Sequence, residues 1–184
     1  MRRLFIVFIL NAVLLVTAAG GETRVAPDWT LQTAEGHTVT LSEVAAERSV
    51  LLLFWATWCP YCKALMPHLQ SIDLEYGDRI EILAIHFRDD KGDPVGFVRE
   101  AGYDFTLLTD GNDVAKLNGI WGTPGVLIVD RHQNIRFDLY TAAQPELPAS
   151  DEDMGHRKKA AYRAPYWAAE IRKSLDEVLD ETSR

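Results

Sequence analysis

Cys59 and Cys62 are the residues whose type and spacing point most directly to chemistry, because they are the only cysteines among 184 residues and enclose Pro60-Tyr61. A disulfide across so short a loop restricts the unfolded chain by only about 2 kcal/mol, against about 3 kcal/mol for a 15-residue loop. A zinc site would need two further ligands, and the five histidines show no paired H-x3-5-H spacing. The spacing therefore favours a redox-active pair over a structural disulfide or a metal site.

The cysteines follow a segment, residues 49–55, that is continuously apolar and of strand length, as in parallel strands buried on both faces. Pro60 then stands where the first turn of a helix tolerates a missing N–H. Gly77 is suited to end that helix. The apolar face of the helix would consist of Leu65, Leu69, Ile72 and Tyr76. Cys59 is thus predicted at the N-terminus of a helix that follows a buried strand.

The predicted helix gives the two cysteines different roles. Unpaired backbone N–H groups and the helix dipole favour a thiolate at Cys59, which precedes the first turn, whereas Cys62 lies within it. The accessible thiol of low pKa attacks a disulfide, and the shielded thiol resolves the mixed disulfide. We therefore predict Cys59 as the nucleophile and Cys62 as the resolving thiol. Beyond this redox-active disulfide, no cofactor is expected.

Beyond the helix, the chain alternates between strand-like and helical segments. The expected elements are a hairpin within residues 29–41, a strand at 79–87, a helix at 94–101, a strand at 105–108, a helical turn at 113–117 and a hairpin over 125–140. Strand–helix–strand units followed by a hairpin and a helix predict an α/β fold. Its expected architecture is a three-layer α/β/α sandwich around a mixed sheet.

The first 24 residues differ from the rest of the chain. Met1-Arg2-Arg3 is a short basic start, residues 4–16 are apolar except for Asn11, and small residues follow at 17–21. This order is typical of a secretory signal peptide, and an uncleaved N-terminal membrane anchor is the alternative. Positive residues before the apolar run place residues 25–184 outside the cytoplasm in either case. At this length, those residues are expected to form one domain.

The charge balance excludes one large class of partners. The chain has 19 Lys and Arg against 27 Asp and Glu, which gives a formal net charge of -8. A nucleic-acid surface needs clustered basic residues. We therefore expect no nucleic-acid partner.

Two motifs resemble the signatures of thioredoxin-fold thiol-disulfide oxidoreductases. One runs from Phe54 to Lys63 with the sequence FWATWCPYCK, and the other from Gly122 to Asp130 with the sequence GTPGVLIVD. Their order and the helical insertion between them resemble the exported TlpA/ResA-like branch over about residues 25–140. The resemblance implies a thioredoxin fold with an N-terminal β-hairpin and a central helical insertion. It also implies an enzyme that exchanges disulfides with protein substrates.

The resemblance assigns roles to residues around the cysteines. In this family the proline of the second motif has a cis peptide bond and faces the cysteines, which gives that role to Pro124. A cis bond there leaves the backbone of Thr123 free to pair with an extended substrate strand. Trp58, Pro60 and Tyr61, together with Thr123, are implied as substrate-binding residues.

The sequence departs from the family at two positions that matter for proton transfer. TlpA/ResA-like proteins usually have a glutamate three residues after the second cysteine, and thioredoxins an aspartate six residues before the first. This chain has Leu65 and Leu53 there. The proton of Cys62 is then left to water, to Lys63, or to His86, which ends a predicted strand at the same sheet edge.

The dipeptide between the cysteines bears on the redox potential. Pro60-Tyr61 resembles the glutaredoxin dipeptide, whose relatives have potentials near -200 to -230 mV, against about -270 mV for thioredoxin. A thiolate stabilised at Cys59 acts in the same direction, because it stabilises the dithiol form. We therefore expect a potential more oxidising than that of thioredoxin.

Residues 141–164 match the family least. The stretch contains two prolines, an acidic run at 151–153 and a basic run at 156–159, with almost no apolar periodicity. We predict a polar insertion loop over 141–164, followed by a C-terminal helix over 165–181. Because the preceding strand is expected to end at the cysteine edge of the sheet, the insertion could overhang the site and select partners by charge.

Several functions stay open. The resemblance implies a periplasmic or other extracytoplasmic disulfide reductase, soluble or tethered to the inner membrane, that acts for example on apocytochrome or copper-site cysteines and uses a membrane or secreted redox partner. The missing carboxylates weaken that reading relative to a thiol oxidase or isomerase of the same fold. A Cu(I) chaperone would use both cysteines as soft ligands. A non-catalytic binding module would need neither cysteine, so the intact pair disfavours it. Peroxidase chemistry is disfavoured as well, because Leu52 and Ala56 stand where peroxiredoxins have Pro and Thr.

Overall fold

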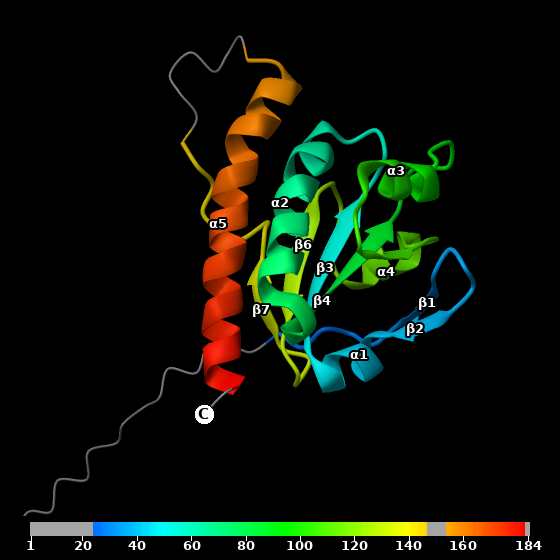
Figure 1. Cartoon of the computed structure of the whole chain (residues 1–184), viewed down its shortest axis with the longest axis vertical. Coiled ribbons are helices and arrows are strands. Elements are labelled where there is room, and N and C mark those ends of the chain that lie inside the picture. The colour runs from blue at the N-terminus through cyan, green and yellow to red at the C-terminus, as the bar shows by residue number, and fades with distance from the viewer. Residues whose placement is uncertain (1–23, 147–153, 183–184) are drawn as a thin grey trace, which may run out of the picture.

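The computed structural model describes residues 24–146 and 154–182, which are built around a five-stranded mixed sheet (Figure 1). The strand order is β5-β4-β3-β6-β7. The first three strands are parallel to one another, whereas β6 and β7 are antiparallel to their neighbours. The strands span Thr106–Leu108 (β5), Ile80–His86 (β4), Ser49–Trp55 (β3), Gly125–Val129 (β6) and Ile135–Asp138 (β7).

β3 lies at the centre of the sheet, and its side chains contribute to two cores. Every residue of this strand is buried. Successive side chains of a strand point to opposite faces, so the strand supplies both clusters of core residues. One cluster contains Leu51, Leu53 and Trp55, and the other contains Val50, Leu52 and Phe54. Burial on both faces explains why this segment is apolar without alternation.

Helices cover both faces of the sheet, so the predicted α/β/α sandwich is confirmed (Figure 1). One face is covered by α2 (Pro60–Tyr76), α3 (Pro94–Ala101) and α5 (His156–Thr182), with the short turn η1 (Gly77–Arg79) after α2. The other face is covered by α1 (Leu41–Glu47), α4 (Asn112–Leu117) and the predicted N-terminal hairpin of β1 (Thr30–Gln32) and β2 (Thr38–Thr40).

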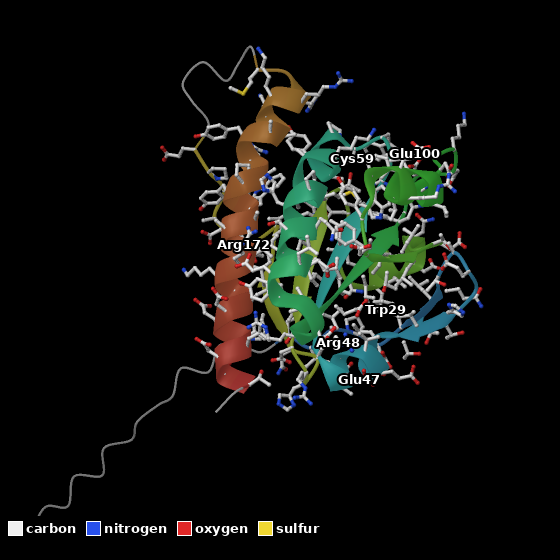
Figure 2. All side chains as sticks on the ribbon, in the orientation of Figure 1. Trp29, Glu47, Arg48, Cys59, Glu100 and Arg172 are labelled. Carbon is white, nitrogen blue, oxygen red and sulfur yellow. The ribbon has the colours of Figure 1, made fainter. Side chains whose placement is uncertain are left out.

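α5 lies alongside α2 for most of its length (Figure 1). Apolar residues of both helices are buried between them and the sheet. The hydroxyl of Tyr76 donates to Asp176 Oδ1 at 2.7 Å, and Arg172 Nε donates to Glu75 Oε2 at 2.7 Å. Figure 2 shows Arg172 on α5, level with the body of α2. These contacts hold α5 against the helix that begins with the cysteine motif.

Two helices differ from the sequence prediction. The predicted loop over 141–164 is wrong from His156 onward, because α5 begins there rather than at 165. Ala160 and Ala164 are buried, and burial of this small-residue face outweighs the basic run before it and Pro165 within it. α1 was not predicted, since only Leu41 and Ala45 of its seven residues are buried and its apolar pattern is short.

The predicted signal peptide or anchor, residues 1–24, lies outside the described residues except for Arg24. The Arg24 guanidinium pairs with Asp138 at 2.9 Å. Among the described residues, no helix is both long and apolar enough to cross a membrane.

Candidate active site

The cysteine motif forms the start of α2, as its spacing predicted. Cys59 is the N-cap residue, Pro60 is the first helical residue, and Gly77 ends the helix. The backbone N–H of Cys62 donates to Cys59 Sγ at 3.1 Å. Figure 2 shows Cys59 at one end of the molecule, with Glu47 and Arg48 at the other. The N-terminal amides of α2 are therefore directed at the Cys59 sulfur.

Both cysteines are reduced and buried, with exposed fractions of 1% for Cys59 and 0% for Cys62. Cys59 was expected to be the accessible partner, so exposure does not separate the two. The packing explains this, since both residues belong to the same apolar cluster as Trp55 and Leu65. What distinguishes the cysteines is the polar environment of each sulfur.

Hydrogen bonds shift the pKa values of the two thiols in opposite directions. The thiol of Cys62 donates to Cys59 and is the largest influence that lowers the pKa of Cys59, which falls to about 6 in spite of burial. The Thr123 hydroxyl and the backbone N–H groups of Cys62 and Tyr61 lower this pKa further. Burial raises the pKa of Cys62 well above its ordinary value, and the contact with Cys59 adds to the rise. Cys59 is thus a thiolate at neutral pH while Cys62 keeps its proton.

Pro124 closes the other side of the site. The Thr123–Pro124 peptide bond is cis, as the resemblance implied. Gly125, the first residue of β6, pairs with Phe54 near the end of β3, which brings the proline next to the cysteine motif. The side chain of Thr123 lowers the pKa of both thiols, which places it beside the two sulfurs. Thr123 and Pro124 are therefore assembled with the cysteines, as predicted.

Two leucines occupy the positions where related proteins carry carboxylates. Leu53 and Leu65 are fully buried in the cluster that contains both cysteines. Lys63, one predicted proton relay, is exposed and places its Nζ 5.5 Å from the centre of the Phe97 ring. That position directs its charge toward α3, so its role in proton transfer stays a prediction.

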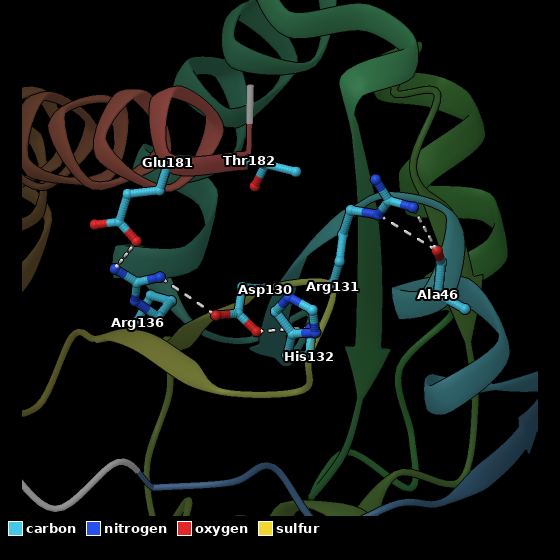
Figure 3. A pocket seen from close by; sticks show the side chains of 7 residues that line it. All are labelled: Ala46, Asp130, Arg131, His132, Arg136, Glu181 and Thr182. Atoms are coloured by element: carbon cyan, nitrogen blue, oxygen red, sulfur yellow. Dashed lines mark hydrogen bonds and ion pairs between the residues drawn. The ribbon is translucent and has the colours of Figure 1, made fainter. Parts of the chain in front are cut away.

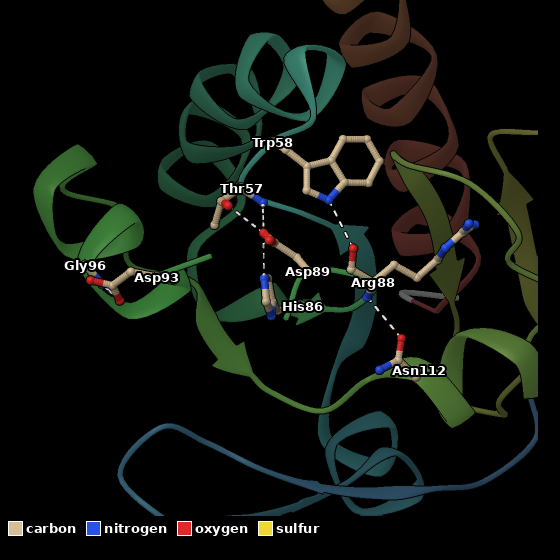
Figure 4. A network of polar contacts seen from close by, with 8 residues as sticks. All are labelled: Thr57, Trp58, His86, Arg88, Asp89, Asp93, Gly96 and Asn112. Atoms are coloured by element: carbon tan, nitrogen blue, oxygen red, sulfur yellow. Dashed lines mark hydrogen bonds and ion pairs between the residues drawn. The ribbon is translucent and has the colours of Figure 1, made fainter. Parts of the chain in front are cut away.

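His86, the other predicted relay, pairs with a carboxylate. It ends β4 opposite Trp55, at the predicted edge of the sheet. Its Nε2 lies 3.1 Å from Asp89 Oδ2 (Figure 4). Its ring packs edge-on against Trp55. A histidine fixed in this way orients the loop around it, and a role in proton transfer stays a prediction.

Asp89 fastens the loop that precedes the cysteines. Its Oδ2 accepts hydrogen bonds from both the backbone N–H, at 2.7 Å, and the hydroxyl of Thr57 (Figure 4). Burial raises the pKa of the Asp89 carboxyl, but the bonds from Thr57 and His86 outweigh it and hold the pKa below its ordinary value. Gly92 packs over this contact: a Cβ there would lie 2.3 Å from the Asp89 carboxylate.

Arg88 connects the loop that holds Trp58, just before Cys59, with the loop that holds Trp121, just before Pro124. Its carbonyl accepts from Trp58 Nε1 at 3.0 Å, and its Nη1 donates to the carbonyl of Trp121 at 2.7 Å. Its φ of 55° lies in the left-handed region, and Asn112 accepts its backbone N–H. Sequence reasoning missed Arg88 and Asp89. The available signal was their position directly after a parallel strand, at the sheet edge where α/β sites form.

The substrate-binding residues predicted from the resemblance surround the sulfurs. Trp58 is exposed, with 58% of its surface accessible, and Pro60 is half-buried at the start of α2. Tyr61 lines a groove of about 380 Å³ together with Thr123 and Pro124. The hydroxyl of Tyr61 lies 3.3 Å from His156 Nδ1, so the segment after β7 does reach the site.

A larger hollow of about 640 Å³ lies at the opposite end of the sheet (Figure 3). Arg136 pairs there with Glu181 at 2.8 Å and with Asp130 at 3.3 Å. Arg131 donates to the carbonyl of Ala46 at 3.1 Å. These charges neutralise one another and lie far from the cysteines, which favours a structural role for this hollow. In the described part of the chain, no three His, Cys, Asp or Glu side chains are grouped as metal ligands.

A mixed sheet with this strand order, a dithiol at the start of α2 and a cis-proline opposite it define a thioredoxin fold with a redox-type site. The model of the AhpC/TSA family matches residues 23–138. The chain therefore belongs to the AhpC/TSA family.

The chain is similar to several thiol-disulfide exchange proteins. It is 31% identical over 120 residues to thiol-disulfide oxidoreductase ResA of Halalkalibacterium halodurans, covering 64% of this chain and 66% of that one. It is 30% identical over 92 residues to thiol:disulfide interchange protein DsbE of Escherichia coli K12, covering 49% and 48%. The chain spans less than two thirds of the length of these curated relatives.

A solved structure supports the fold. The thioredoxin domain of a thiol-disulfide oxidoreductase from Bacteroides vulgatus matches with a TM-score of 0.58 and 23% identity, covering 64% of this chain and 88% of that domain. At this level of identity the match concerns the fold alone.

Proposed function

We propose that this protein is an extracytoplasmic thiol-disulfide oxidoreductase that exchanges disulfides with other proteins through Cys59 and Cys62. The observation that carries the proposal is that the pKa values of the two thiols are shifted in opposite directions. The pKa of Cys59 is lowered to about 6, while that of Cys62 is raised. A thiolate next to a protonated partner is the arrangement that nucleophilic exchange followed by resolution requires.

The first step is attack by the Cys59 thiolate on one sulfur of a substrate disulfide. The bond between Cys59 and that sulfur forms while the substrate disulfide breaks, and the second substrate sulfur leaves as a thiolate. In the mixed disulfide, Cys59 carries no charge. The charge and hydrogen bond of Cys59 that help to raise the pKa of Cys62 are then lost. Formation of the intermediate therefore makes Cys62 easier to deprotonate.

The second step is attack by Cys62 on the Cys59 sulfur. The departing substrate thiolate takes up the proton of Cys62, directly or through water, so no buried carboxylate is required. The bond between Cys59 and the substrate breaks, and the second substrate thiol is released. The substrate disulfide has been reduced to two thiols, and Cys59 and Cys62 have been oxidised to a disulfide. An external dithiol protein must then restore the reduced pair.

Reduction of protein disulfides outside the cytoplasm is the direction we propose. Similarity to ResA and DsbE over about half of the chain or more supports exchange with protein thiols. The basic start and apolar run of residues 1–16 support export. Oxidation of substrate thiols is the second candidate, and the stabilised Cys59 thiolate favours it because it stabilises the reduced form of this protein.

Trapping in cells tests the proposal and its direction. A Cys62→Ala variant, expressed as the full chain, is expected to accumulate mixed disulfides through Cys59, which mass spectrometry identifies. Cys59→Ala is the matched control and should accumulate few, since Cys62 is a poor nucleophile. Wild-type protein found mainly as the dithiol in the cell would support reduction, and mainly as the disulfide would support oxidation. An absence of mixed disulfides in the Cys62→Ala variant would contradict the proposal.

A further inference from the structure

A groove of about 380 Å³ lies beside the cysteine motif, between the cis-proline loop and α5. Its lining includes Tyr61 at the start of α2, Thr123 and Pro124 of the cis-proline loop, and Arg163 and Trp167 of α5, whose side chains contact the Tyr61 ring. Tyr61 follows Cys59 by two residues and the side chain of Thr123 lies beside the Cys59 sulfur, so the groove leads to the nucleophile.

The walls of the groove are aromatic and are held in place. Trp121 stacks on Tyr140 with 4.8 Å between the ring centres, and 74% of its surface is exposed. The Tyr140 hydroxyl accepts from the backbone N–H of Gly122 and donates to the Gly122 carbonyl. Trp167 donates to Gln144 Oε1 at 2.8 Å. Rigid aromatic walls suit a segment of polypeptide, because they bind side chains at little cost in entropy.

Among the described residues that line this groove, Arg163 alone has a charged side chain. Its guanidinium lies 5.9 Å from the centre of the Tyr61 ring. Its Nε is buried and has no hydrogen-bond partner among the residues that the structure describes. Arg163 as a residue is only partly buried, and among the described residues its guanidinium has no carboxylate partner. A carboxylate is the acceptor whose geometry and charge match a guanidinium best.

The first part of α5, which contains Arg163, is basic. Between His156 and Glu170, α5 carries Arg157, Lys158, Lys159 and Arg163 and no acidic residue. The chain as a whole carries a formal net charge of -8. A basic helix start beside the nucleophile of an acidic protein attracts acidic segments to that place and repels them elsewhere.

We propose that the groove binds the substrate segment that carries the reactive disulfide and that Arg163 pairs with an Asp or Glu side chain of this segment. The proposal rests on the proposed function and adds to it a substrate class, namely protein disulfides flanked by acidic residues. Arg163 is a specificity residue here, since it contacts the substrate away from the sulfurs.

The experiment uses short peptides with one cysteine capped as a mixed disulfide with thionitrobenzoate. Each peptide has a Glu at one of the three positions before or after the cysteine, and its matched peptide has Gln there. Reduced wild-type protein is expected to react about tenfold faster with at least one Glu peptide than with its Gln partner, which is the lower end for a hydrogen bond to a charged group. The ratio should decrease with added salt.

Substitutions in α5 test whether Arg163 causes the preference for Glu peptides over Gln peptides. Arg163→Gln should bring the Glu-to-Gln ratio to about one, and Arg163→Lys should keep part of it. Arg157→Gln is the control, because Arg157 is exposed on the same helix and does not line the groove, and it should keep the wild-type ratio. The ratio compares two substrates of one variant, so a change in overall reactivity does not imitate the effect.

Two results would overturn the proposal. A wild-type ratio near one at every position would show that the groove does not select acidic segments, and an unchanged ratio in Arg163→Gln would assign selection elsewhere. In both cases the exchange reaction itself would still be observed. Failure of the wild-type protein to react with any peptide would instead contradict the proposed function, and the groove proposal with it.

Discussion

The Cys62 thiol is the largest influence that lowers the pKa of Cys59, and replacing it tests that assignment. A hydrogen bond to a charged group contributes about 1.5–3 kcal/mol, which corresponds to about 1–2 pKa units. Cys62→Ala removes the donor, so the pKa of Cys59 should rise from about 6 to roughly 7–8. The thiolate fraction at pH 7 should then fall from about 90% to roughly 10–50%.

Cys62→Ser is the matched control, because the serine hydroxyl can donate in place of the thiol. The pKa of Cys59 in this variant should therefore stay near 6. Each variant has a single thiol, so ultraviolet thiolate absorbance or the rate of iodoacetamide alkylation, followed against pH, reports Cys59 alone. Alkylation of Cys62→Ala at pH 7 should be about two- to ninefold slower than that of Cys62→Ser. Equal pKa values near 6 in both variants would refute the assignment and leave the α2 amides and Thr123 as the cause.

Three further predictions concern the loop and the potential. Asp89→Ala should lower the free energy of unfolding by about 2 kcal/mol at pH 7, measured with urea, because it leaves the two Thr57 donors unpaired. Since the pKa of Asp89 is lowered in the folded state, this difference should shrink as the pH falls below about 4. A pH-independent difference would contradict the explanation that the ionised carboxylate accepts the Thr57 hydrogen bonds. Gly92→Ala should lower the free energy of unfolding by about 1–3 kcal/mol, because its Cβ would collide with the Asp89 carboxylate. Gly155→Ala, whose Cβ would meet no atom of the described residues within 4 Å, should have little effect in the same urea titration. The pKa of Cys59 is about 6, against about 7 for the thioredoxin cysteine, so the dithiol form at pH 7 is favoured by about 1 kcal/mol more than in thioredoxin. This difference places the redox potential about 20 mV above -270 mV. Equilibration with glutathione that gives a potential of -270 mV or lower would contradict this prediction.

The sequence predicted the parts of the structure that depend on local pattern. The continuous apolar run of β3 and the proline after Cys59 identified the strand and the start of α2, and both elements have the expected place. The cis bond at Pro124 followed from the resemblance and was confirmed. These features were predictable because buried strands and helix starts restrict which residues can occupy each position.

The features that sequence reasoning missed depend on contacts between distant segments. α5 extends back to His156 because Ala160 and Ala164 are buried in the assembled core, and the charges around them concealed this. Asp89 gains its role only because the loop after β4 folds back onto Thr57, which precedes it by 32 residues. A single carboxylate in a polar loop carries no periodic signal, so its partner had to be seen in the structure.

The measurement that tests the central claim most directly is the identity of the sulfur that binds the substrate. The Cys62→Ala and Cys59→Ala variants are each incubated with the same peptide disulfide, and the covalent product is mapped by mass spectrometry. The account predicts rapid attachment of the peptide at Cys59 in the first variant and little attachment at Cys62 in the second. Faster attachment at Cys62, or none at Cys59, would contradict it.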